Sequence, residues 1–299
     1  MRAGALATGM LDRLGVGFVW LMHLLPLGWI RAVGRAIGGL LYRLGQGRVA
    51  RINVGLCFPH WQPAQRERLV GEHFRMVGGC FLELGIAWWS RKERIERLVR
   101  IVGREHYEAV RDRRVIWLAP HFLGLDLGGA RIAIEYGGTS LYSRQKRPLL
   151  DRILVRARTR FNGVEVFPRQ EGLRPAIAAI KRGKPFYFLP DMDFGARDAV
   201  FVPFFGVPAA TVTTLQRLCR ITGAIVVPCV SRRLTGSDGY EVRFHPAWTD
   251  FPSADPIADA RRMNAFIEER VLEMPEQYFW IHKRFRTRPE GEPSFYDRT

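Results

Sequence analysis

The sequence predicts an α/β fold in which a mostly parallel or mixed sheet is flanked by helices, with a helical segment before it. From Val115 onward, short apolar runs that suit buried strands alternate with segments of helical periodicity. Such alternation is typical of a sheet covered on both faces by helices. The chain of 299 residues is long enough for one or two domains. We expect a membrane-anchoring or interfacial segment over 1–50 and one α/β domain over 51–299.

Local sequence pattern predicts each helix and strand in turn. Two helical regions are expected first, over 16–44 and 63–89, and then a charged, solvated connector over 91–114 with short helical or strand pieces. Glycines in the first region would allow close helix packing or membrane contact. Strands are predicted at 115–119, 139–142, 164–167, 185–189, 225–230 and 240–245. Helices are predicted at 123–136, 148–160, 173–182, 213–222 and 259–273.

The segment 14–30 is apolar and carries no formal charge, although His23 and Pro26 interrupt it. A helix that spans a bilayer needs about 20 apolar residues, so this segment is borderline. A retained anchor or an interfacial helix is the preferred interpretation. A buried core helix and a cleaved signal peptide are the alternatives. Arginines follow the segment and would keep that end on the cytoplasmic side.

The charge balance is the unusual property of the composition. Lys and Arg number 46 and Asp and Glu 29, which gives a formal net charge of +17. This charge predicts an acidic partner, whether a nucleic acid, an anionic lipid or an acidic protein. The apolar fraction of 47% argues against a mainly disordered chain. The four cysteines form no CxxC pair, which indicates a reducing compartment and argues against structural zinc.

A histidine stands directly after the predicted strand 115–119 and before a predicted helix. A loop histidine at His121 could face Asp126 in the first turn of that helix. Catalytic groups in α/β sheets gather outside the carboxyl ends of the strands. His121 would then act as a general base toward a substrate hydroxyl, with Asp126 fixing its tautomer. The alternative is a loop histidine without chemistry and an Asp that merely suits a helix start.

Charged side chains also follow two other predicted strands. Arg144 comes after 139–142 and could reach a phosphate or an oxyanion. Asp191 and Asp193 come after 185–189, where they could hold hydroxyls or a basic group, or simply form a turn. Paired carboxylates also bind metals, but no other oxygen ligands accompany them, so no metal is expected.

The C-terminal stretch 275–291 interleaves aromatic rings with basic side chains. Such a pattern could bind nucleic acid, a lipid headgroup at a membrane surface, or nothing beyond solvent. His282 lies within it as a weaker candidate for binding. The basic candidates are Lys283, Arg284, Arg286 and Arg288.

Taken together, these motifs resemble the late acyltransferases of lipid A biosynthesis, the lauroyl and myristoyl transferases. The resemblance covers about 119–296 and is most specific over PEQY and WIHKRFRTRPEG, with VFVPFFG (200–206) in agreement. The likeness to the wider glycerolipid acyltransferases is looser, because LPDM (189–192) stands where their Phe-Pro-Glu-Gly segment lies. Some lipid A members carry Glu where Asp126 stands here.

The resemblance implies an enzyme at the cytoplasmic face of a bacterial inner membrane. It would transfer a fatty acyl chain from acyl carrier protein to a hydroxyl on a hydroxyacyl chain of a lipid A precursor, with no other cofactor and no covalent acyl-enzyme. His121 would be the base and Asp126 its partner. The positive charge suits both the acidic carrier and the anionic glycolipid. The basic stretch 144–160 has an apolar side and could lie at the membrane.

Two other functions fit parts of the sequence. A lysophospholipid or glycolipid acyltransferase would use the same dyad on a different acceptor, although the C-terminal segment argues against it. A non-enzymatic protein that binds membranes or nucleic acid would account for the charge alone. No helix-turn-helix, zinc-finger or RNA-binding signature is present, so we expect no nucleic-acid partner.

Overall fold

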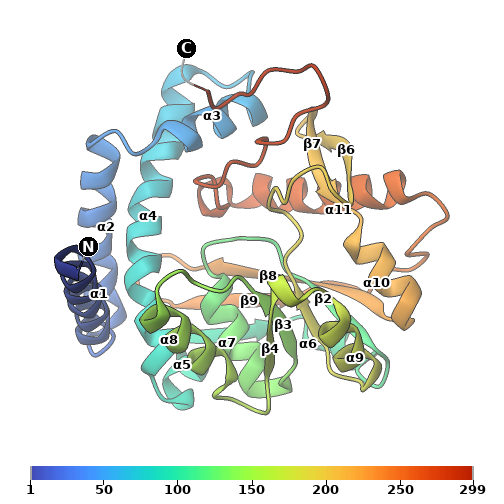
Figure 1. Ribbon diagram of the computed structural model, residues 1–299, viewed down its shortest axis with the longest axis horizontal. Coiled ribbons are helices and arrows are strands. Elements are labelled where there is room, and N and C mark those ends of the chain that lie inside the picture. The colour runs from blue at the N-terminus through green and yellow to red at the C-terminus, as the bar shows by residue number, and fades with distance from the viewer. Residues whose placement is uncertain (1, 298–299) are drawn as a thin grey trace.

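The N-terminal part of the molecule is a stack of helices at one side of the sheet (Figure 1). The computed structural model describes residues 2–297. The helical region expected over 16–44 is two helices, because Pro26 interrupts it at the start of the second. The four helices are α1 (Arg2–Met22), α2 (Leu27–Arg43), α3 (Arg48–Cys57) and α4 (Pro63–Trp89). In the described part of the chain, no helix combines the length and hydropathy needed to cross a bilayer.

Glycines bring α2 and α4 into backbone contact. A Cβ atom placed on Gly34 would lie 2.3 Å from the Cα of Gly79, and one on Gly38 would lie 2.0 Å from the carbonyl oxygen of Phe74. Any side chain at these positions would therefore push the two helices apart. The close helix packing that the glycines predicted is confirmed.

The sheet has seven strands in the order β1-β9-β8-β2-β5-β3-β4. Neighbouring strands are parallel except β8 and β9, which pair antiparallel, so the sheet is mixed as expected. A separate antiparallel hairpin is formed by β6 (Ala199–Phe204) and β7 (Val207–Val212). The sheet strands are β1 (Val99–Val102), β2 (Val115–Leu118), β3 (Thr139–Tyr142), β4 (Glu165–Pro168), β5 (Phe186–Phe188), β8 (Ile225–Arg233) and β9 (Tyr240–Phe244).

Helices lie on both faces of the sheet (Figure 1). Side chains of β2 alternate between two hydrophobic clusters, with Ile116 and Leu118 in one and Val115 and Trp117 in the other. The remaining helices are α5 (Lys92–Leu98), α6 (Arg104–Glu108), α7 (Leu125–Tyr136), α8 (Pro148–Thr159), α9 (Arg174–Lys181), α10 (Thr214–Thr222) and α11 (Pro256–Glu273), with 3-10 turns at Arg169–Glu171 and Pro275–Gln277.

The elements expected from 115 onward are present, and their ends lie within three residues of the expected positions. Helix α3, strand β1 and the β6–β7 hairpin had no predicted position, although the connector over 91–114 was expected to hold short helical or strand pieces. The strand β1 lies in the charged connector and forms the edge of the sheet, where the Arg100 side chain is exposed and pairs with Glu241. The β6–β7 hairpin has a proline in each strand, Pro203 and Pro208, and these face one another in the register.

Candidate functional site

The site is built where two neighbouring parallel strands end. Leu118 at the end of β2 is in register with Phe188 at the end of β5. His121 and Asp191 each follow three residues later, so both loops leave the same edge of the sheet. The Nδ1 atom of His121 lies 2.7 Å from an oxygen of Asp191, and the His121 backbone N–H donates to the other carboxylate oxygen at 2.9 Å.

The Asp191 carboxylate is almost fully buried beneath the imidazole, with 2% of the residue exposed. Burial raises the pKa of Asp191, but the neighbouring His121 charge and its two hydrogen bonds outweigh this and leave the pKa below its usual value. Asp191 is therefore ionised at neutral pH and accepts a hydrogen bond from Nδ1–H of His121. The Nε2 atom is then the basic nitrogen, and among the described residues it has no hydrogen-bond partner.

The C-terminal segment holds the His121 loop from outside. The backbone N–H of Phe279 donates to the His121 carbonyl at 3.0 Å, and Leu123 N–H donates to the Gln277 carbonyl at 2.9 Å. Between these two bonds Phe122 and Tyr278 form an isolated antiparallel bridge. The His121 loop is thus fixed by a segment that lies more than 150 residues further along the chain.

The expected contact between Asp126 and the His121 ring nitrogen is wrong: Nδ1 binds Asp191. Asp126 lies in the first turn of α7 and forms an ion pair of 3.5 Å with Arg158 of α8. The reason lies in the strand order, because β5 ends directly beside β2 and brings Asp191 under the ring. Asp126 nonetheless lines the same cavity as His121. Its catalytic role stays a prediction.

Three cavities adjoin one another here: His121 lines the second and third, and Arg158 and Leu189 line all three. The first, of about 90 Å³, is the apolar cavity between α7, α8 and the sheet. The second, of about 270 Å³, runs from His121 along α4 past Phe81 and is called the α4 cavity. The third, of about 480 Å³, is walled by the loops after β3, β4 and β5 and is called the loop cavity.

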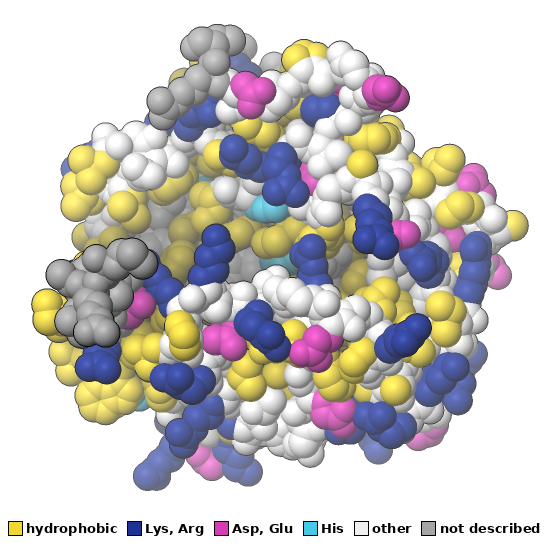
Figure 2. Space-filling view, viewed as in Figure 1, with side chains coloured by type: hydrophobic (Ala, Val, Ile, Leu, Met, Phe, Trp, Pro, Cys, Tyr) yellow, Lys and Arg dark blue, Asp and Glu magenta, His cyan; other side chains and the backbone are white. Residues whose placement is uncertain are grey.

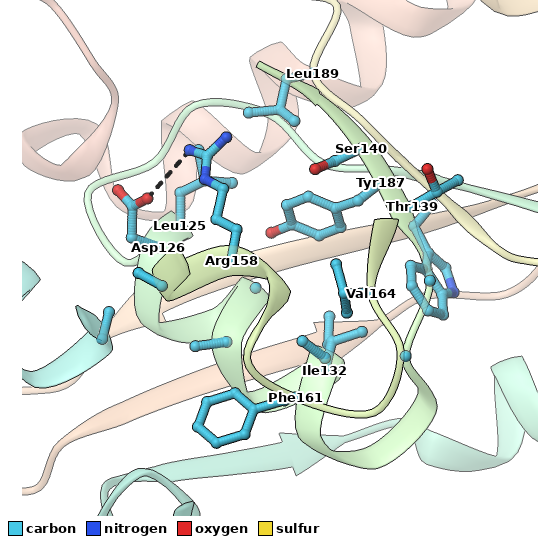
Figure 3. Close-up of a pocket in the computed structure, with 18 of the residues that line it drawn as sticks. Leu125, Asp126, Ile132, Thr139, Ser140, Arg158, Phe161, Val164, Tyr187 and Leu189 are labelled. Carbon is cyan, nitrogen blue, oxygen red and sulfur yellow. Dashed lines mark hydrogen bonds and ion pairs between the residues drawn. The ribbon is translucent and has the colours of Figure 1, made fainter. Parts of the chain in front are cut away.

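The apolar cavity is lined mainly by hydrocarbon. Figure 3 shows the ion pair of Asp126 and Arg158 on one side of it and Phe161, Ile132 and Val164 on another. Small residues of α7 leave the space open. A cavity of this kind suits an alkyl chain whose polar end stays near the charged pair.

Arg144 faces solvent, and its expected contact with a phosphate or an oxyanion stays a prediction. Its guanidinium is exposed and pairs with Glu171 at 3.1 Å, and Arg144 lines none of the three cavities. The arginine that lines the same cavities as His121 is Arg158, which the sequence does not distinguish from the other basic residues of 144–160. Helical periodicity could have indicated Arg158, because it shares a face of α8 with Leu154, and both side chains line the loop cavity.

Asp193 fastens the C-terminal segment to the loop after β5. Its carboxylate accepts hydrogen bonds from the Thr287 backbone N–H at 2.6 Å and hydroxyl at 2.7 Å. The backbone N–H of Asp193 donates to Nε2 of His282 at 2.8 Å. Burial, followed by the nearby His121 charge, lowers the pKa of His282 to about 4. The expected contact of Asp193 with an acceptor is thus replaced by internal hydrogen bonds.

The basic residues of the C-terminal stretch divide by burial. Arg284 is 2% exposed and donates to the Ala210 carbonyl and the Thr211 hydroxyl, so its predicted headgroup contact is wrong. The Arg288 guanidinium is also largely buried and binds the Pro208 carbonyl and Glu292. Lys283 and Arg286 are exposed, and Arg286 lies 3.6 Å from Asp193.

In the described part of the chain, no three His, Cys, Asp or Glu side chains gather in a way that could hold a metal ion. The cysteines are free thiols, and burial raises the pKa of each of them.

Comparison with known proteins places the chain in a family. Residues 5–287 match the bacterial lipid A biosynthesis acyltransferase family. This chain belongs to that family. It is 36% identical to the lipid A biosynthesis lauroyltransferase of Escherichia coli K12 over 95% of the chain and 94% of the relative. It is 32% identical to the palmitoleoyltransferase of the same organism over 94% and 93%.

Among solved structures, the chain is similar to the 1-acyl-sn-glycerophosphate acyltransferase of Thermotoga maritima. The TM-score is 0.39 and the identity 15%, covering 80% of this chain and 96% of that one. The family membership makes the chain an acyltransferase of lipid A biosynthesis. The resemblance read from 119–296 is confirmed, and the match extends back to residue 5.

Proposed function

We propose that this lipid A acyltransferase transfers a fatty acyl chain from acyl carrier protein to a hydroxyl on a hydroxyacyl chain of a lipid A precursor. The observation that carries this is the buried Asp191 carboxylate that holds Nδ1 of His121 at 2.7 Å, while the ring borders two cavities. Two cavities that open on one base suit a reaction in which two large substrates meet at that base.

In the proposed step, Nε2 of His121 takes the proton of the acceptor hydroxyl as that oxygen attacks the thioester carbonyl. A C–O bond forms, and the C–S bond breaks as the tetrahedral intermediate collapses. The imidazolium then returns its proton to the leaving thiolate, so no proton is gained or lost. Asp191 keeps the ring in the required tautomer and stabilises the imidazolium. No acyl-enzyme is needed.

Arg158 is our candidate for the group that stabilises the developing oxyanion or a substrate phosphate. It lines all three cavities, and a guanidinium donates two parallel hydrogen bonds to such oxygens. Asp126, 3.5 Å from Arg158, would hold that guanidinium in place. Asp126 then contributes through the arginine rather than through the imidazole.

The membrane side of the protein is proposed to be the α1–α2 hairpin, within the anchoring segment 1–50. Large apolar side chains are strongly exposed there, among them Leu14 at 62% and Trp29 at 65%. Phe81 of α4 is 60% exposed and lines the α4 cavity. A lipid acceptor held in the cytoplasmic leaflet of the inner membrane would reach His121 through that cavity.

Purified enzyme tests the proposal directly. Wild type, incubated with an acylated carrier and a lipid A precursor, should yield acylated precursor by mass spectrometry. His121→Ala should abolish the product, whereas His60→Ala, at an exposed histidine, is the matched control. A lysophosphatidic acid acceptor is run alongside. Preference for that acceptor would support the glycerolipid alternative, and full activity of folded His121→Ala protein would refute the base.

A further inference from the structure

We propose that the open end of the loop cavity is the docking surface for a small acidic protein, which delivers the acyl thioester on a long phosphodiester-linked arm. This inference rests on the proposed function and deepens it, because it assigns the two substrates to opposite approaches. The donor enters between the loops after β3, β4 and β5, and the acceptor enters along α4.

The loop cavity connects this surface with the catalytic base. Its inner end is formed by His121, Leu189 and Met192, and its outer end includes the exposed Arg169 and Arg197. Between them the lining is mainly apolar. With a volume of about 480 Å³, it is the larger of the two cavities that His121 lines. An extended arm that ends in a thioester needs this kind of passage.

The outer end carries positive charge that the protein itself does not neutralise. Arg169 and Arg197 line this end of the cavity, and Lys146 and Arg174 are the chain neighbours of the lining residues Gln145 and Leu173. All four cations are exposed, and none has an acidic partner within the described residues. By contrast, Asp198 at the same rim is paired with Arg217 at 2.9 Å.

These unpaired like charges repel one another and favour an acidic partner that meets them. Stacking of the Arg169 guanidinium on Phe194, 4.3 Å from the ring centroid, holds one of the charges at the rim. Figure 2 shows Lys and Arg side chains around a central hollow that contains histidine.

The distribution of exposed apolar side chains favours a protein over a lipid surface at this rim. Strongly exposed large hydrophobic residues gather on α1, α2 and at Phe81, and within the described chain none occurs between Phe81 and Phe201. An interfacial surface would combine cations with inserted apolar side chains. None of the large hydrophobic side chains that line the loop cavity is strongly exposed, so its rim lacks such inserted side chains.

Charge reversal at the rim tests this assignment. The variant pairs Arg169→Glu with Arg197→Glu, and the control pairs Arg111→Glu with Arg113→Glu, two exposed arginines that precede β2 at the opposite edge of the sheet. Donors are an acylated carrier protein and an acyl-pantetheine thioester, which has neither the protein nor the phosphate. Thermal melting verifies that each variant is folded.

We expect the KM for the carrier donor to rise at least tenfold in the rim variant. The loss of kcat/KM on the carrier should exceed the loss on acyl-pantetheine by at least tenfold, and the salt dependence of kcat/KM should flatten. The control should behave as wild type. Arg169→Gln with Arg197→Gln should give an intermediate effect.

Equal losses on both donors, or an equal effect in the control, would overturn the docking surface while leaving the acyltransferase function intact. Loss of binding to vesicles of phosphatidylglycerol and phosphatidylethanolamine, with carrier KM unchanged, would reassign the rim to the membrane and also overturn it. If the wild type transfers acyl groups from neither donor, the proposed function itself fails, and that outcome is distinct from the others.

Discussion

Replacing Asp191 by Asn tests whether Asp191, which contacts the His121 ring in the structure, or Asp126, expected from the sequence spacing, orients the imidazole. Asp191 accepts two hydrogen bonds from His121, at 2.7 Å to the ring and 2.9 Å to the backbone, in a site that is almost closed to water. An amide of the same shape can donate its N–H to Nδ1. The imidazole would then carry its proton on Nε2, so that Nε2 could not accept the proton of the acceptor hydroxyl.

The size of the effect follows from this change of tautomer. In a hydrolase triad the equivalent Asp-to-Asn change lowers kcat by about 10⁴ while the geometry is kept. We expect a loss of roughly 10³–10⁴ for Asp191→Asn, or about 4–5.5 kcal/mol at about 1.4 kcal/mol per decade. Asp126→Asn removes only the contact with Arg158 and should cost about 10–100-fold.

The assay is single-turnover acyl transfer followed by mass spectrometry, with circular dichroism and thermal melting to confirm folding. Both variants are compared at one pH near neutrality. The reasoning is refuted if Asp191→Asn keeps its rate within tenfold of wild type while Asp126→Asn loses 10³-fold or more. That result would make Asp126 the orienting carboxylate in the reactive state.

Three other predictions concern protein stability and acyl-chain length. Burial lowers the pKa of His73 to about 4 from an unfolded value of about 6.5, so the unfolded protein binds the proton more tightly than the folded protein. The free energy of unfolding, measured by urea titration, should therefore fall by up to about 3 kcal/mol as the pH decreases from about 6.5 to 4, and His73→Leu should flatten this slope. Gly129→Leu projects toward Tyr187, since a Cβ there lies 3.5 Å from the ring, and should shift donor preference to shorter acyl chains in a competition assay; an unchanged preference would exclude the apolar cavity as the chain site. Arg284→Met leaves buried oxygens unpaired and should destabilise by about 3 kcal/mol, whereas exposed Arg286→Met should change the unfolding free energy by less than about 1 kcal/mol; equal effects would contradict the division by burial.

Sequence pattern predicted most elements of the sheet because its central strands are short, apolar and bounded by Pro or Gly. It gave β1 no definite position, because the charged side chains of an edge strand stay in solvent and make the segment resemble a connector with short pieces of structure. Pattern also placed His121 and Asp191 after separate strands. Only the strand order, with β5 beside β2, brings the two together, and no local signal in one sequence reveals that order.

The basic residues show a second limit of sequence reading. Seven cations lie within 144–160, and the count alone could not tell that Arg158 faces the cavities while Arg144 faces solvent. In the C-terminal stretch, Arg284 and Arg286 are two residues apart, yet one is buried and the other exposed. Which cation is structural depends on carbonyl and hydroxyl groups supplied by distant segments such as β7.

The glycine contact between α2 and α4 has a mechanical consequence. At the other end of that contact, Glu83 of α4 forms buried ion pairs with Arg31 of α2 at 3.4 Å and with Arg233 of β8 at 3.0 Å. The hairpin is therefore clamped to the sheet rather than tethered by a linker, so it cannot swivel on its own. When the α1–α2 hairpin rests on a surface, the His121 imidazole therefore stays at a fixed distance and orientation from that surface. Acyl transfer is then limited to substrates whose reactive groups lie at that distance.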